Sequence, residues 1–154
     1  MIESEYMYNS MKQALNALDL TYTESRDSFE IMCPITVGED IQELFLAVRP
    51  RQEMFRIMSV LPGTFKKEQQ TEAVIACCAV NQNLGIGQFS WHADYGRIIF
   101  LMAAPYGICR NMREWVAHQM IWTHIILTKY GKLFEWLGEG RIPLKKFIEK
   151  IEKL

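Results

Sequence analysis

Five short apolar segments, in several of which apolar residues alternate with polar ones, constrain the fold of this chain most strongly. Such alternation is typical of half-buried β-strands, because successive side chains of a strand point to opposite faces. Within each group of strands the connections are too short for a parallel crossover, so neighbouring strands should be antiparallel. The pattern predicts strands at Phe29 to Ile35, Ile41 to Val48, Met54 to Leu61, Phe89 to Trp91, and Ile98 to Met102.

Segments with helical periodicity surround and interrupt these strands. Apolar residues at spacings of three and four predict helices over residues 3–18, 66–82 and 109–136, with Thr64 as the expected cap of the second. Pro143 begins a short amphipathic tail helix. The order helix, three strands, helix, two strands, long helix predicts an α+β fold. We expect a five-stranded antiparallel sheet with helices packed on one face, followed by the tail helix.

Length and composition fit one domain with a tail. A chain of 154 residues with 49% hydrophobic and 23% charged residues is apolar enough to fold around one core. We expect residues 1–137 to form the domain and residues 138–154 to be a joint followed by the tail helix. The first residues are acidic where a secretory signal would be basic, and the most apolar stretch, 117–128, is too short to span a membrane. These features favour a cytoplasmic protein.

The charge balance argues against partners that are recruited by a strong electric field. The formal net charge is -1, so the chain as a whole does not attract nucleic acid or anionic lipid. A local basic patch is conceivable near the first hairpin, but acids are interspersed there and no aromatic platform accompanies it. The residues of that candidate patch are Arg49, Arg51, Arg56, Lys66 and Lys67. Nucleic-acid binding is therefore not expected.

No group of residues has the spacing of a metal site or of a catalytic constellation. His118 and His124 lie about 240° apart around one helix, so they cannot ligate one metal together. The cysteines have no metal-type spacing, and the adjacent pair falls on apolar helix stripes where cysteine acts as a small hydrophobe. The four cysteines are Cys33, Cys77, Cys78 and Cys109. We expect no catalytic residue, metal or cofactor; an enzyme using Cys109 or Cys78 is an alternative that requires a reactive thiol.

Apolar residues exceed what a single core-facing side of each element needs. The helix over 66–82 carries two apolar stripes, and the strand over 98–102 is apolar on both faces although helices cover only one face of a small antiparallel sheet. On the long helix, Ile121, Trp122 and Ile125 fall off the core stripe. This surplus favours self-association or a peptide-binding face.

Two passages resemble the YbjN-type family of proposed sensory-transduction regulators. They run from Ala79 to Phe89 and from Asp94 to Phe100, and they combine an asparagine-containing helix end, a Gly-x-Phe strand and a turn glycine before an apolar strand. The order of elements from Glu3 to Trp136 also resembles the type III secretion chaperone fold, to which that family is structurally akin. The resemblance implies a homodimer without cofactor or catalytic residues that holds protein in extended form. Such chaperones are typically strongly acidic, whereas this chain is nearly neutral.

The leading hypothesis is a non-enzymatic, chaperone-like regulator that binds a client polypeptide and forms a homodimer. We predict dimer contacts on the second helix and the strand after it, from Val74, Cys77, Cys78, Phe89 and Trp91. We predict a surface for peptide or ligand on the long helix, from Trp115, Met120, Trp122 and Ile125. The alternative is a small-molecule sensor with a pocket between the sheet and the long helix, lined by Trp115, Trp122 and Met120.

Overall fold

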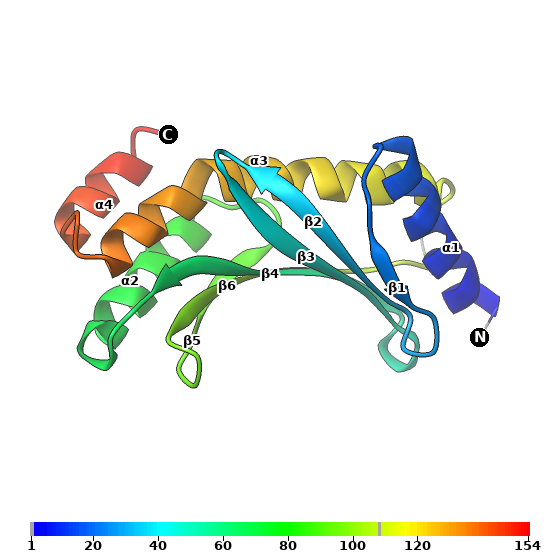
Figure 1. Cartoon of the computed structure of the whole chain (residues 1–154), viewed down its shortest axis with the longest axis horizontal. Coiled ribbons are helices and arrows are strands. Elements are labelled where there is room, and N and C mark those ends of the chain that lie inside the picture. The colour runs from blue at the N-terminus through cyan, green and yellow to red at the C-terminus, as the bar shows by residue number, and fades with distance from the viewer. Residues whose placement is uncertain (1, 108) are drawn as a thin grey trace. The chain divides into compact units, whose positions relative to one another are not determined.

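The computed structural model describes residues 2–107 and 109–154, which form four α-helices and a six-stranded sheet (Figure 1). The strand order is β1-β2-β3-β4-β6-β5. The strands are β1 (Thr23–Ser25), β2 (Glu30–Val37), β3 (Asp40–Arg49), β4 (Met54–Thr64), β5 (Gln88–His92) and β6 (Arg97–Pro105). The helices are α1 (Ile2–Ala17), α2 (Gln70–Asn81), α3 (Met112–Gly138) and α4 (Leu144–Ile151). The predicted α+β class and antiparallel sheet are confirmed, with one strand more than predicted.

The additional strand is β1, which pairs antiparallel with β2 and places Glu24 opposite Ile31. Its three residues are all exposed and polar or charged. A strand at the edge of a sheet that faces solvent on both sides has no apolar alternation, so its sequence lacks the signal that identified the other five.

Two helices begin later than predicted, and at the start of each a side chain accepts a hydrogen bond from a backbone N–H. Strand β4 runs through Thr64, and a 3-10 turn over Lys67–Gln69 precedes α2. There the Gln69 side chain accepts a hydrogen bond from the Lys66 N–H at 2.8 Å. Helix α3 begins at Met112, where the side chain of Asn111 accepts a hydrogen bond from the Glu114 N–H at 3.3 Å.

The described chain groups into two compact units. Unit 1 is formed by the described residues of Met1–Met58 and Met102–Ile125, and unit 2 by Ser59–Leu101 and Ile126–Leu154. The tail helix α4 belongs to unit 2 and contacts α2, as Figure 1 shows. The division into a domain over 1–137 and a tail over 138–154 stays a prediction.

In unit 1 the β2–β3 hairpin carries the core against α1. Gly38, with a φ of 63°, forms the tight turn that lets Val37 pair with Asp40. The register places Cys33 opposite Leu44, and both are fully buried. Helix α1 contacts β3 and contributes the buried side chains Met7, Met11 and Leu15.

In unit 2 the core is a cluster of aromatic rings around Phe89. Its ring centroid lies 5.2 Å from that of Phe100 and 4.9 Å from that of Phe134. Phe147 of α4 extends the cluster, because its centroid lies 5.1 Å from that of Phe134 and its side chain is fully buried. Such tilted ring pairs contribute beyond the area they bury, so α4 is a structural part of this unit.

The end of α2 is joined to β5 by the side chain of Asn81. Its Nδ2 donates to the carbonyl oxygen of Phe89 at 2.8 Å, and its Oδ1 accepts from the Phe89 N–H at 2.8 Å. Phe89 opposes Phe100 across the β5–β6 pair, and β5 is the last strand of the sheet. Asn81 therefore satisfies the outward backbone groups of an edge strand, which would otherwise be open to pairing with another chain.

Gly87 is the glycine of the Gly-x-Phe passage, and its surroundings explain why a glycine is needed there. Its φ is 73°, and a Cβ built on it would lie 2.5 Å from the ring of Phe100. A side chain there would both strain the backbone and displace the aromatic cluster.

We predict that Asn81→Ala lowers the free energy of unfolding by about 1–3 kcal/mol, because it leaves the N–H and the carbonyl of Phe89 without their partner. Urea unfolding followed by circular dichroism measures the loss. Asn83→Ala is the matched control, because Asn83 is exposed and the change should stay within about 0.5 kcal/mol. Equal effects of the two substitutions would show that the Asn81 hydrogen bonds do not stabilise the unit.

Candidate functional site

The part of α3 in unit 1 has apolar residues on its exposed side as well as on its buried side. Met112, Val116 and Met120 are buried and hold the helix in the unit. Ile121 and Ile125 are 46% and 45% exposed. They are four positions apart, so they lie on one face, one helical turn from each other.

Trp122 extends this surface around the helix. It lies three positions before Ile125, and its side chain is 53% exposed. We call Ile121, Trp122 and Ile125 the α3 apolar row. Large exposed side chains that form one continuous surface are more informative than isolated ones, because a single exposed apolar residue is normal.

A hollow of about 360 Å³ adjoins the α3 apolar row and belongs entirely to unit 1. Ile121 is a member of both, and most of the lining is apolar. The lining residues are Leu18, Leu20, Ile35, Thr36, Met120, Ile121 and His124. Leu18 and Leu20 are the neighbours of Asp19 in the sequence. Asp19 has a left-handed φ of 53° in the turn that follows α1.

His124 fixes the polar border of this hollow. Its Nε2 lies 2.9 Å from the carbonyl oxygen of Thr36, and because only an N–H can donate to a carbonyl, this ring nitrogen carries the proton. The contact joins α3 to the end of β2. This hydrogen bond therefore connects two of the elements that line the hollow.

The four residues predicted for a peptide or ligand surface have different places. Trp122 and Ile125 are exposed in the α3 apolar row. Met120 is buried and lines the hollow from the core side. Trp115 is half-buried and packs edge-on against Phe55, with 5.3 Å between the ring centroids. Of the three residues predicted to line a ligand pocket, only Met120 is among those that line this hollow.

The five residues predicted for a dimer surface also divide between surface and interior. Val74 is 42% exposed on α2, and Cys78 is exposed one turn further along the same face. Cys77 and Phe89 are buried. Trp91 is half-buried, and its ring packs edge-on against that of Phe65, with 5.7 Å between the ring centroids. The exposed apolar surface of α2 therefore consists of Val74 and Cys78 together with Ile75, which is 43% exposed and belongs to the same apolar stripe of the helix.

The buried thiols have chemistry that opposes reaction. Burial raises the pKa of the Cys77 thiol to about 12, and it also raises the pKa of Cys33. With a raised pKa, both thiols stay protonated at neutral pH. They react slowly in that form, because the thiolate is the nucleophile. Among the described residues, no three His, Cys, Asp or Glu side chains gather as ligands for a metal ion.

We predict that a thiol reagent modifies Cys78 at least about tenfold faster than Cys77 in the folded protein, because Cys78 is exposed whereas its neighbour is buried. Mass spectrometry of timed samples at neutral pH distinguishes the two. Unfolding in urea should remove the difference. Rapid modification of Cys77 in the folded protein would contradict the placement of that side chain in the core.

Comparisons with known proteins reveal similarity at the level of the fold. No protein-family model matches the chain, and no curated protein matches it in sequence. Among solved structures, YbjN, a proposed transcription regulator from E. coli, superposes with a TM-score of 0.56 at 9% identity, covering 80% of this chain and 90% of that chain. The structure of the HopA1-SchA chaperone-effector complex contains a chain that superposes with a TM-score of 0.51 at 12% identity, covering 100% of this chain and 98% of that chain.

These similarities confirm the fold that the sequence resemblance implied, a YbjN-type, chaperone-like arrangement of helices and strands. At such low identity they establish the fold alone. The residues of the α3 apolar row and of the hollow therefore have to be interpreted by their own geometry.

Within the described part of the chain, no helix is long and apolar enough to cross a bilayer.

Proposed function

We propose that this protein is a non-enzymatic, chaperone-like regulator that holds an extended segment of a client polypeptide on unit 1. The observation that carries the proposal is the α3 apolar row beside the apolar hollow. The row offers side chains about half exposed, and the hollow offers space for an apolar side chain of the client. The chaperone-effector complex among proteins of similar fold supports a polypeptide as the occupant.

The energetics of this surface favour a polypeptide over a compact ligand. Covering a large apolar side chain contributes roughly 1.5–3 kcal/mol when it goes from fully exposed to buried, and about half of that is available from each residue of the row. Ile121 belongs to the hollow, but Ile125 and Trp122 lie outside its lining. A small molecule within the hollow would leave those two side chains exposed, whereas an extended chain can cover all three.

We further propose that the protein acts as a homodimer through α2 in unit 2. Val74, Ile75 and Cys78 are exposed on one side of this helix, while Ala73 and Cys77 face the core of their own unit. A symmetric contact between two copies would cover the exposed side of both helices at once. No catalytic step or cofactor belongs to the proposal. We place the protein in the cytoplasm, where the four cysteines would stay reduced.

We predict that Ile121→Asp and Ile125→Asp each weaken binding of an unfolded polypeptide by about tenfold or more, because each change removes apolar contact and adds a charge that must be desolvated. Fluorescence anisotropy with labelled, permanently unfolded lactalbumin measures the affinity. Gln13→Asp is the matched control, because it adds the same charge at an exposed position of α1.

Unchanged binding by both Ile121→Asp and Ile125→Asp, with the fold intact by circular dichroism, would remove the α3 apolar row from the proposal. A thermal-shift screen against metabolites tests the small-molecule alternative. A ligand that stabilises the wild type, together with no affinity for unfolded polypeptide, would favour a sensor that uses the hollow alone.

We predict that Val74→Asp converts the dimer to a folded monomer, because a charge would be buried at the centre of the contact. Light scattering coupled to gel filtration measures the mass at micromolar concentration. Glu72→Lys is the control, because Glu72 is exposed on the same helix beyond the apolar side. A wild-type protein that is monomeric, or a dimer that tolerates Val74→Asp, would disprove this interface.

A further inference from the structure

A second hollow in unit 1, of about 460 Å³, is lined by three arginines. Arg49 comes from the end of β3, Arg51 from the 3-10 turn over Pro50–Gln52, and Arg56 from β4. Asp27 and Ser28 of the β1–β2 connection complete the opposite side. Three of the five residues of the candidate basic patch therefore line one hollow, whereas Lys66 and Lys67 belong to unit 2.

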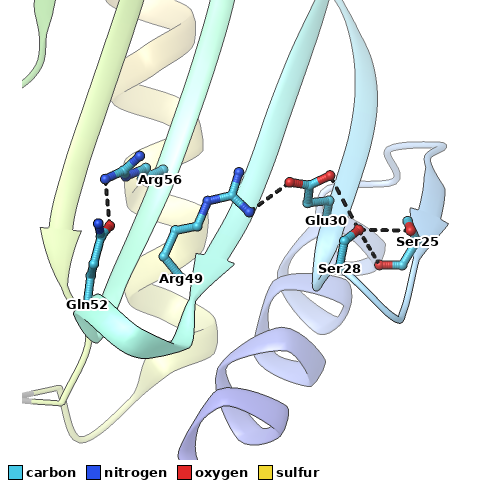
Figure 2. Close-up of polar contacts among 6 residues, drawn as sticks. All are labelled: Ser25, Ser28, Glu30, Arg49, Gln52 and Arg56. Carbon is cyan, nitrogen blue, oxygen red and sulfur yellow. Dashed lines mark hydrogen bonds and ion pairs between the residues drawn. The ribbon is translucent and has the colours of Figure 1, made fainter.

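The three guanidinium groups differ in their partners, and Figure 2 shows those of Arg49 and Arg56. The Nη1 of Arg49 lies 2.7 Å from a carboxylate oxygen of Glu30, so its charge is balanced. The Nη2 of Arg56 donates to the Oε1 of Gln52 at 2.7 Å, while its Nε is buried without a partner in the described chain. Arg51 is exposed and makes neither a hydrogen bond nor an ion pair to any described residue.

Two cations therefore remain without a carboxylate, next to a hollow that is large enough for a small ligand. Asp27 lines the same hollow but forms no ion pair within the described residues. Arginines gathered in this way repel one another, and an oxyanion between them would relieve the repulsion and use the free N–H donors. Ser28 also lines this hollow, and its hydroxyl oxygen lies 2.8 Å from the hydroxyl oxygen of Ser25.

The backbone on both sides of the hollow has a costly conformation. Phe29, which lines it, has a φ of 53°, and Glu53, which directly follows the 3-10 turn, has a φ of 52°. A left-handed conformation in residues other than glycine is uncommon, and such residues cluster at functional sites. Glu53 is held there on both sides, because its N–H donates to Pro50 O and its carbonyl accepts from the Tyr106 N–H, each at 3.2 Å. The arginines thus project from a fixed frame.

We propose that this hollow binds the phosphate group of a small phosphorylated molecule, with Arg51 and Arg56 as its main ligands and Arg49 at the border. Two guanidinium groups without carboxylate partners match the two charges of a phosphate monoester, and the planar N–H fork fits its oxygens. This site goes beyond polypeptide binding and shares no residue with the α3 apolar row or its hollow.

Calorimetric titration of the full chain with inorganic phosphate and with glycerol phosphate, against chloride at equal ionic strength, tests the proposal. Both should bind, and Arg51→Gln should weaken them about tenfold. Arg56→Gln should weaken binding by a similar factor, provided that circular dichroism shows the variant to be folded. If that variant does not fold, Arg51→Gln still tests the site, because Arg51 is exposed. Asp27→Asn should tighten binding, because it removes a like charge. Arg113→Gln, an exposed arginine on α3, should leave the affinity unchanged.

Three results would overturn the proposal. One is the absence of any heat of binding beyond that of chloride, and another is an equal loss from Arg51→Gln and Arg113→Gln. The third is binding that appears only with vesicles containing phosphatidic acid, which would identify a lipid surface and not a small molecule as the source of the phosphate.

Discussion

The pair of hydrogen bonds between Asn81 and the backbone of Phe89 is the constraint on which unit 2 depends. It fixes the end of α2 against an edge strand and so determines which ring enters the aromatic cluster. Once Phe89 is placed, the rotation of α2 follows, because Ala76 and Val80 must face the core. The exposed side of α2, with Val74 and Ile75, is therefore a consequence of how the unit folds.

Unit 1 likewise exposes apolar residues beyond those that its core buries. Met112, Val116 and Met120 already bury the inner side of α3. Ile121, Trp122 and Ile125 add apolar area on the outer side, next to a hollow whose own lining is mainly apolar. Residues that the fold does not require and that expose continuous apolar surface are best explained by a partner that covers them.

Much of the fold follows from the sequence because its main signals are local. The alternation of the buried residues Ile31 and Cys33 with less buried neighbours, and the turn glycine Gly38, determine the β2–β3 hairpin. Strand β1 has no such alternation, because neither face is buried. The placement of Phe89 and Cys77 in the core was not accessible in this way, since a repeat of two or of 3.6 shows that a face is apolar but not what covers it.

The candidate sites were less predictable than the elements that carry them. Off-stripe positions identified Trp122 and Ile125, because helical geometry converts sequence spacing into a direction. The hollow beside them could not be found, since Leu18, Leu20 and Ile35 come from segments that meet only in the folded unit. Sequence position alone grouped Arg51 and Arg56 in a candidate basic patch, but it could not show that residues of the β1–β2 connection complete the arginine hollow.

Site-specific photo-crosslinking tests most directly whether a client polypeptide binds along the α3 apolar row. A benzophenone amino acid placed at Trp122 should crosslink to an unfolded polypeptide, and the same group placed at Gln13, exposed on α1, should not. Peptide mapping should locate the crosslinks in apolar, extended segments of the client. Equal crosslinking from both positions, or none from position 122 while the polypeptide is bound, would contradict binding along the α3 apolar row.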